Sequence, residues 1–299
     1  MRRLSLISAC LLLLAAPVAA QQVPDPAADA TMAHPRFPAG TGPRVAIDSG
    51  HHEINTLEGR YALFGRMAAN DGYRVADFQG ALTVQGLSGV DVLVISNPTP
   101  NDAGHAAFSR AEAESLRAWV EAGGALLLIV DHTPMTVGVG PVAEVFGLTF
   151  LDGYVVHGGT PEIFARADGT LGDHPITRGE GGGEPIARVR AFTGSAFTPP
   201  SQATVLMRLD DRWRLVRPSE TVKSVLDLTP GVPSEAVTGY TQGAAWTLGK
   251  GRVVVLGEAA MFNAQLIGPS QKKAGINAEG AEQNKAFLSN ILRWLTPTA

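Results

Sequence analysis

The sequence predicts a doubly wound α/β domain, in which helices cover both faces of a mostly parallel sheet. Strands that are buried on both faces consist of apolar runs, and such runs alternate here with segments of helical periodicity. The chain has 299 residues, of which 45% are hydrophobic, enough to bury a core of this kind. The clearest predicted strands are Arg44 to Asp48 (RVAID), Tyr73 to Phe78, Asp91 to Ser96 (DVLVIS), Ala125 to Val130 (ALLLIV) and Arg252 to Gly257 (RVVVLG).

Segments between and after these strands have the pattern of helices. Apolar residues recur at helical spacing from Leu57 to Ala68, and Asn70-Asp71-Gly72 follows as a stop signal. The stretch from Ser109 to Glu112 has the spacing of a capping box, so a second helix should begin there and end at Gly123-Gly124. A final helix carries apolar residues from Phe287 to Leu295.

The pattern changes between Leu148 and Leu248, where short β-like runs are separated by glycine and proline. We interpret these runs as extra β segments inserted in the second half of the sheet. Because the last strand and helix complete the pattern of the first half, residues 43–299 are expected to form one domain. The inserted runs are Ile186 to Phe192, Ala203 to Leu209 and Val222 to Leu228.

The N-terminus has the composition of a secretory signal peptide. A basic start is followed by an apolar stretch from Leu4 to Ala16 and by small residues that end at Ala20, after which cleavage is expected. Residues 1–20 would then be removed, residues 21–42 would form a Pro/Ala-rich linker, and the protein would be exported, to the periplasm or beyond. The apolar stretch is too short to span a bilayer, and no later segment reaches that length.

Cysteine usage limits the chemistry of the exported chain. Cys10 is the only cysteine and lies inside the predicted signal peptide, so disulfides, thiolate metal sites and cysteine nucleophiles are all excluded after cleavage. Residues 7–10 faintly resemble a lipoprotein cleavage box, but the apolar stretch before Cys10 is short for such a box. The formal net charge of −4 shows no basic excess, which argues against a nucleic-acid partner.

Polar side chains collect after the predicted strands. Parallel strands bring their carboxyl ends to one edge of a sheet, where ligands bind in open α/β folds. The candidate catalytic residues at this edge are Asp48, His51, His52, Asp131, His132 and Glu258. The candidate ligand-binding residues are Asn55, Asn97, Asn263 and Gln265. Four loops deliver these groups, and their convergence is the strongest functional signal in the sequence.

Each candidate also has a structural interpretation. Asp48 fits an Asx turn, and His51 and His52 point in different directions, so at most one of them should face a pocket. Asp131 could cap a turn while His132 bonds the backbone, and Glu258 could simply neutralise a neighbouring histidine.

A divalent metal is one hypothesis for this edge, because aspartate, glutamate and histidine are suitable ligands for zinc, manganese or calcium. The hypothesis rests on composition and location, since the sequence has no HExxH motif, no cysteine pair and no EF-hand loop. A serine hydrolase is disfavoured, because Gly194-Ser195 lacks the remainder of a nucleophile elbow.

The stretch from Glu121 to Ile129 (EAGGALLLI) and the stretch from Asp173 to Gly179 (DHPITRG) resemble the class I glutamine amidotransferase-like superfamily. The resemblance is to its non-amidotransferase branches, which include ThuA-like proteins and exported bacterial domains of unknown function. It extends over residues 44–299 through Ile47 to His52 and Gly257 to Phe262. It implies a flavodoxin-like sheet and, from the ThuA-like branch, a small polar or sugar-like ligand.

The sequence departs from the superfamily at the nucleophile. Amidotransferases carry a cysteine after the strand that corresponds to Ala125 to Val130, whereas this chain has Asp131 and His132 there. Glutaminase activity by the family mechanism is therefore excluded. Two functions stay open. The first is a hydrolase of a small polar or carbohydrate-like substrate, in which one histidine is the acid/base, Asp48 or Glu258 orients it, and a metal is an optional activator of water. The second is a non-catalytic ligand-binding or scaffold module of the cell envelope.

Overall fold

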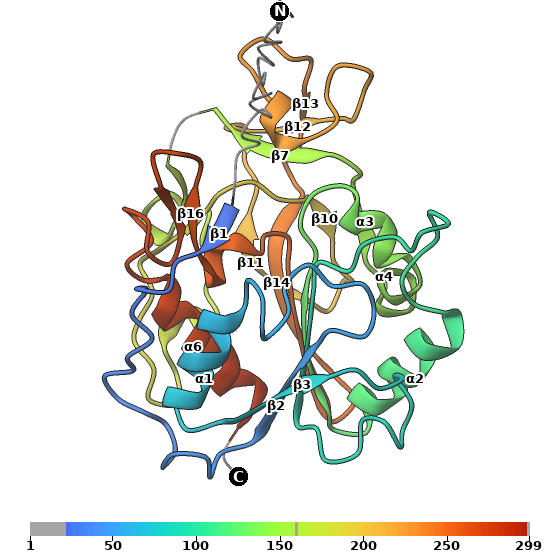
Figure 1. The fold of residues 1–299 in the computed structure, drawn as a ribbon, viewed down its shortest axis with the longest axis vertical. Coiled ribbons are helices and arrows are strands. Elements are labelled where there is room, and N and C mark those ends of the chain that lie inside the picture. The colour runs from blue at the N-terminus through green and yellow to red at the C-terminus, as the bar shows by residue number, and fades with distance from the viewer. Residues whose placement is uncertain (1–21, 159–160, 298–299) are drawn as a thin grey trace, which may run out of the picture.

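A mixed β-sheet organises the chain in the computed structural model, which describes residues 22–158 and 161–297 (Figure 1). The sheet has nine strands. Its parallel part places five strands side by side in the order β3 (Arg74–Phe78), β2 (Arg44–Asp48), β4 (Val92–Ser96), β5 (Ala125–Ile129) and β15 (Gly251–Leu256). The prediction of an α/β fold with a mostly parallel central sheet is confirmed. The predicted signal peptide, residues 1–20, lies outside the described residues.

The order in which successive strands are added to the sheet reverses at β2, because β3 lies on one side of β2 and β4 lies on the other. Such a reversal leaves a crevice at the carboxyl ends of the two strands. Beyond β15 the sheet continues with antiparallel strands, which are β14 (Thr241–Leu248), β10 (Phe197–Thr198), β6 (Thr149–Phe150) and β11 (Thr204–Arg208).

Helices cover both faces of the sheet, as predicted. The two helices α1 (Ala62–Asn70) and α6 (Asn284–Leu295) pack on one face, and α2 (Arg110–Glu121) and α4 (Gly140–Phe146) pack on the other (Figure 1). Alternate residues of β4 belong to opposite cores: Val94 packs with the cluster of α1 and α6, and Ile95 with that of α2 and α4. This alternation explains why the strand is apolar throughout.

The helix boundaries differ from the predicted ones at one place. The first helix begins at Ala62 rather than Leu57, because the backbone N–H groups of Gly59 and Tyr61 both donate to the carbonyl of Thr56 and close turns there. The capping box of α2 is confirmed: Ser109 Oγ accepts from the Glu112 N–H at 3.2 Å, and the Ser109 N–H donates to Glu112 Oε2 at 3.0 Å.

Three small sheets complete the fold. They are β1 (Gln22–Pro24) with β16 (Ala264–Ile267) and β17 (Lys272–Gly275); β13 (Glu235–Ala236) with β12 (Trp213–Val216) and β7 (Tyr154–His157); and β8 (Glu162–Ala165) with β9 (Arg188–Ala191). The short helices are α3 (Met135–Gly138), α5 (Pro175–Arg178), η1 (Arg166–Asp168), η2 (Val225–Asp227) and η3 (Ala260–Phe262).

Two segments have a different structure from the one that their sequence pattern predicts. The predicted strand Val222 to Leu228 contains η2 instead, because Asp227 Oδ2 accepts the N–H groups of Lys223 and Ser224, both at 2.8 Å, and bends the chain. The segment predicted as a linker carries β1, and its Arg36 donates through Nη1 to the carbonyl of Arg293 at 2.9 Å. None of the helices within residues 22–158 and 161–297 has the length and apolar character that crossing a bilayer requires.

Removing a side chain from the centre of the sheet should lower the free energy of unfolding. Leu128 of β5 is fully buried, so Leu128→Ala is expected to cost about 2–5 kcal/mol, through lost transfer free energy and the cavity left behind. Val84, which is 69% exposed, provides the control, and Val84→Ala should change the value by less than about 0.5 kcal/mol. Urea denaturation followed by circular dichroism measures both.

Candidate functional site

A cavity of about 540 Å³ opens at the carboxyl edge of the parallel strands. Four strand ends contribute to it: Asn55 follows β2, Asn97 follows β4, Asp131 follows β5 and Glu258 follows β15. Segments inserted later in the chain form the rest of its wall, chiefly the β8–β9 pair and the β16–β17 hairpin. The predicted site residues that line it are Asn55, Asn97, Asp131, His132, Glu258, Asn263 and Gln265.

Asparagine side chains tie the strand ends together at the base of the cavity. Asn97 has a φ of 57°, a left-handed conformation that asparagine tolerates better than most residues. Its Oδ1 accepts the N–H of Asp131 at 2.9 Å, which links the ends of β4 and β5. Asn55 Nδ2 donates to Ser96 Oγ at 3.0 Å and links the loop after β2 to β4. Side-chain hydrogen bonds therefore connect the strand ends at this edge, where the backbone hydrogen bonds between the strands end.

Glu258 is a buried carboxyl at the start of η3. It is 1% exposed, and its two oxygens accept the N–H groups of Ala260 at 2.7 Å and Met261 at 2.8 Å. Burial and the charge of Asp131 nevertheless raise the pKa of Glu258 well above its ordinary value, and the charge of Glu162 acts in the same direction. Glu258 is thus a buried carboxyl whose surroundings favour its protonated form.

Glu162 and Arg190 also line the cavity, although neither is among the candidates that the sequence indicates. Burial raises the pKa of Glu162 to about 8, and the charge of Asp131 adds to the rise while the charge of Arg190 opposes it. Two buried atoms, Glu162 Oε2 and Arg190 Nε, have no hydrogen-bond partner among the described residues. The available signal for Arg190 was the pair of arginines, Arg188 and Arg190, inside the apolar run Ile186 to Phe192.

Asp131 and His132 each have both of the roles that the sequence left open, a structural role in a turn and a place in the candidate site. Asp131 Oδ1 accepts the N–H of His132 at 2.8 Å, and His132 Nδ1 lies 2.7 Å from the carbonyl of Thr133, so both residues shape the turn after β5. Both also line the cavity. The imidazole packs against Tyr154, with ring centroids 4.9 Å apart, which limits its movement.

Asp48, His51 and His52 are not among the residues that line the cavity. His51 and Asp48 form a second, buried cluster in which His51 Nδ1 lies 2.8 Å from Asp48 Oδ2 and Nε2 lies 3.3 Å from Glu112 Oε1. The His51 N–H donates to Glu53 Oε2 at 2.8 Å. His52 is exposed, with a φ of 60°.

This cluster has the donor set of a metal site, since one atom each of Asp48, His51 and Glu53 lie within 4.8 Å of one another. Both ring nitrogens of His51 nevertheless face carboxylates, an arrangement that a protonated imidazole satisfies with two N–H donors. Burial alone would lower the pKa of His51, but the hydrogen bond and charge of Asp48, with Glu53 and Glu112, outweigh it and raise the pKa to about 9. The two carboxyl contacts of the ring and the raised pKa therefore favour a protonated His51 in this cluster.

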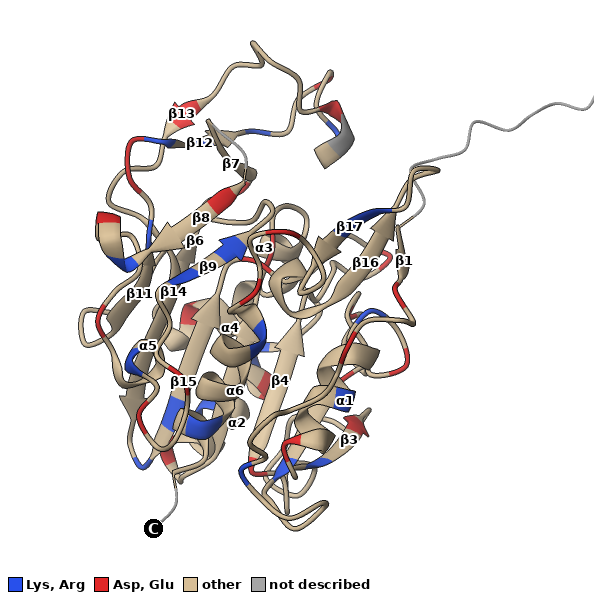
Figure 2. Cartoon of the chain, turned by 90° about the vertical axis from the view of Figure 1, so that its left-hand side faces the viewer, with Lys and Arg blue, Asp and Glu red and all other residues tan. Residues whose placement is uncertain are grey.

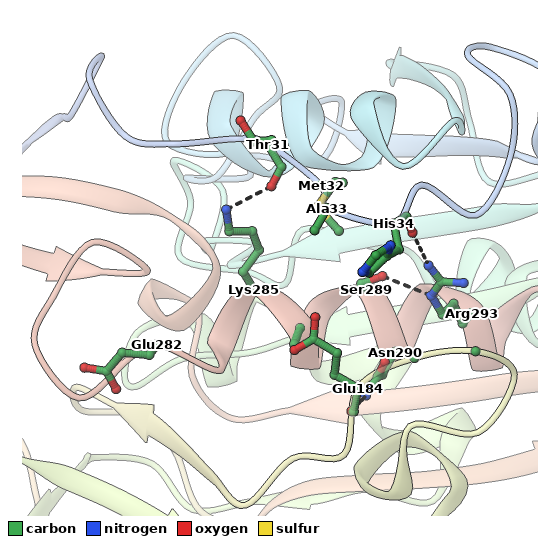
Figure 3. A pocket seen from close by; sticks show the side chains of 13 residues that line it. Thr31, Met32, Ala33, His34, Glu184, Glu282, Lys285, Ser289, Asn290 and Arg293 are labelled. Atoms are coloured by element: carbon green, nitrogen blue, oxygen red, sulfur yellow. Dashed lines mark hydrogen bonds between the residues drawn. The ribbon is translucent and has the colours of Figure 1, made fainter.

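A second cavity, of about 170 Å³, lies between α6 and the N-terminal segment (Figure 3). Its cationic side chains are already paired. Lys285 Nζ donates to the carbonyl of Thr31 at 3.0 Å, and Arg293 donates through Nη2 to the carbonyl of His34 at 3.0 Å and through Nε to Ser289 Oγ at 3.2 Å. These contacts fasten the N-terminal segment to α6, so we assign this cavity a structural role.

Replacing His51 should destabilise the protein in a pH-dependent way. His51→Ala leaves buried carboxylates without their cationic partner, and we expect a loss of about 3–5 kcal/mol in the free energy of unfolding at pH 6. Because the folded-state pKa of about 9 exceeds the ordinary value of 6.5, this contribution is complete below pH 6.5 and is lost as the pH rises through 9.

The exposed neighbour provides the matched control, since His52→Ala should change stability little at either pH. Denaturant titrations at pH 6 and pH 9.5 measure both variants. An equal loss for His51→Ala at the two pH values would show that His51 acts through packing and not through its charge.

Comparisons with known proteins identify the fold. No family model matches the chain, and no curated protein matches it. The chain is similar to the N-terminal domain of mmIFT52, with a TM-score of 0.59, 16% identity, and coverage of 85% of this chain and 98% of that one. A cytoplasmic protein from Salmonella typhimurium matches with a TM-score of 0.52 and 12% identity over 86% of this chain and 100% of that one. A ThuA-like protein from Bacteroides uniformis matches with a TM-score of 0.46 and 15% identity over 91% and 95%. The two neighbours with TM-scores above 0.5 establish a shared fold and, at these identities, nothing beyond it.

Proposed function

We propose that the 540 Å³ cavity binds a small polar, carbohydrate-like molecule and hydrolyses it by acid–base chemistry. Asp131 accepts a proton from water, the resulting hydroxyl adds to the substrate carbon, and Glu258 donates its proton to the leaving oxygen as the carbon–oxygen bond breaks. One observation carries the proposal: a buried carboxyl with a raised pKa lies beside a second carboxyl in a large cavity. Environments that push two neighbouring carboxyls apart in pKa are typical of acid–base sites.

The amide groups of the cavity support a polar ligand. Asn263 is 1% exposed, and its Oδ1 has no hydrogen-bond partner among the described residues, so it is free to accept a hydrogen bond from a ligand hydroxyl. Gln265 lines the same wall. Such groups fix the orientation of a polar ligand in a cavity.

We further propose that residues 43–299 form a flavodoxin-like domain of the glutamine amidotransferase-like superfamily that lacks glutaminase activity. The order of the parallel strands supports this, since in sequence order it is 2-1-3-4-5. The residues after β5 are Asp131 and His132, and the chain has no cysteine after Cys10 that could act as the thiol nucleophile.

A non-catalytic ligand-binding module is the second candidate, and one observation favours it. Both carboxyl oxygens of Glu258 already accept backbone N–H groups, so the residue has a structural role at the start of η3. In that case the cavity would bind its ligand without cleaving it.

Substitution of the two carboxyls separates these candidates. Asp131→Asn and Glu258→Gln should each lower the rate of hydrolysis of 4-nitrophenyl glycosides by about 10²- to 10⁴-fold, the usual contribution of a positioned acid or base. Sugar binding, measured by calorimetry, should persist, and the control His52→Ala should match the wild-type rate. Binding without any wild-type hydrolysis would favour the non-catalytic module, and full activity in both variants would contradict the assigned roles.

We also propose that the protein is exported and that its mature chain begins at Gln21. Mass spectrometry of the protein recovered from the periplasm or medium of an expressing bacterium should show a chain of residues 21–299. Ala20→Leu replaces the small residue directly before the expected cleavage site with a large one, so this variant should block cleavage. Cytoplasmic protein that retains Met1 would contradict the proposal.

A further inference from the structure

The wall of the 540 Å³ cavity carries more cationic side chains than the neighbouring acids balance. Arg60, Arg190, Lys272 and Lys273 line it. Figure 2 shows the positive positions on β9 and β17 near the upper end of the sheet, with the acidic position of β8 close to β9. The acidic residues of the same wall are Asp131, Glu162 and Glu258.

These cations have no ion-pair partner within residues 22–158 and 161–297. Arginines elsewhere on the surface are commonly paired, as where Arg178 Nη1 lies 2.6 Å from Asp173 Oδ2. Arg60 is half-buried and makes no hydrogen bond or ion pair in the described part of the chain, although the charge of Asp131 acts on it from beyond contact distance. Its guanidinium lines the cavity and is therefore available to an anionic ligand.

Arg190 is held in position for such a partner. Its Nη1 donates to the carbonyl of Glu279, and its guanidinium carbon lies 4.8 Å from the centre of the Phe192 ring. These two contacts orient the planar guanidinium and leave Nε, which is buried, without a hydrogen-bond partner among the described residues. A fixed guanidinium with a free N–H matches the geometry of a carboxylate.

The acids of the wall do not cancel this positive charge at neutral pH. Burial raises the pKa of Glu162 to about 8, and burial with the charge of Asp131 raises the pKa of Glu258 well above its ordinary value. The surroundings of both groups therefore favour their protonated, uncharged forms, which reduces the negative charge on the wall. An anionic ligand would meet net positive charge on the cavity wall.

We propose that the ligand of this cavity is a sugar that carries a carboxylate, of the hexuronate class, with its carboxylate bound by Arg190 and Arg60. This assignment rests on the proposed function, because it names the substrate class of the same site. The sugar hydroxyls donate to Asn263 Oδ1 and pair with Glu162, whose buried Oε2 lacks a partner among the described residues. Lys272 and Lys273 lie on β17, where exposed ammonium groups attract an anion toward the cavity.

Calorimetry with matched probes tests the inference on the mature full-length protein at pH 7. Glucuronate should bind about tenfold or more tightly than glucose, which has the same ring without the charge, since a charge-assisted hydrogen bond contributes more than a neutral one. Glucose 6-phosphate distinguishes a carboxylate site from a phosphate site. The inference is overturned if glucose binds as tightly as glucuronate, or if the phosphate binds more tightly than either.

The Arg190→Gln variant should remove most of the difference between glucuronate and glucose while leaving glucose binding unchanged. Lys250→Gln, at an exposed turn away from the cavity, is the control and should retain the difference. If Arg190→Gln does not fold, the double variant Lys272→Gln/Lys273→Gln, at exposed positions, should still weaken glucuronate binding and lower its dependence on salt. A glucuronate preference that survives these substitutions would overturn the assignment.

The same panel separates failure of this inference from failure of the proposed function. Hydrolysis of 4-nitrophenyl β-glucoside without a preference for 4-nitrophenyl β-glucuronide would reject the anionic ligand and retain the hydrolase. Absence of binding and hydrolysis for every probe would reject both.

Discussion

Parallel pairing of β2, β3, β4, β5 and β15 is the constraint on which the rest of the structure depends. Because these strands run in one direction, their carboxyl ends meet at one edge of the sheet, and the loops that follow them must lie side by side. The backbone ladder ends there, so side chains take over the hydrogen bonding. Asn97 and Asn55 make those links, and their contacts set the base of the cavity. A different strand direction would disperse these loops.

Burial of charge is handled in two ways at this edge. In the cluster of Asp48 and His51, the buried Asp48 carboxyl lies against the His51 imidazole, whose raised pKa favours its protonated form, so the charges compensate within the protein. In the cavity, burial raises the pKa of Glu162 and of Glu258 and so favours their protonated forms, while Arg60 and Arg190 lack ionic partners among the described residues. The first arrangement pairs Asp48 with His51 inside the protein and stabilises the fold. The second leaves polar groups unpaired, which is the physical signature of a binding site.

The cavity is closed by segments that are distant in sequence from the parallel strands. The β8–β9 pair brings Glu162 and Arg190, and the β16–β17 hairpin brings the two lysines. The N-terminal strand β1 pairs with β16, and Gln22 also lines the cavity. The inserted β segments therefore do more than extend the sheet, since they supply the charged wall that determines which ligands fit.

The sequence by itself determined the α/β class, the strands of the parallel sheet and the capping box of α2, because burial on both faces and local hydrogen bonding leave direct patterns in the chain. It also indicated that Asn97, Asp131 and Glu258 would meet, since strand direction alone brings them to one edge. Only the tertiary structure decided that His51 turns away from the cavity to pair with Asp48 and Glu112, and that Arg60, Glu162 and Arg190 face into it. Side-chain direction in loops and the placement of inserted strands depend on long-range packing, which no local pattern encodes.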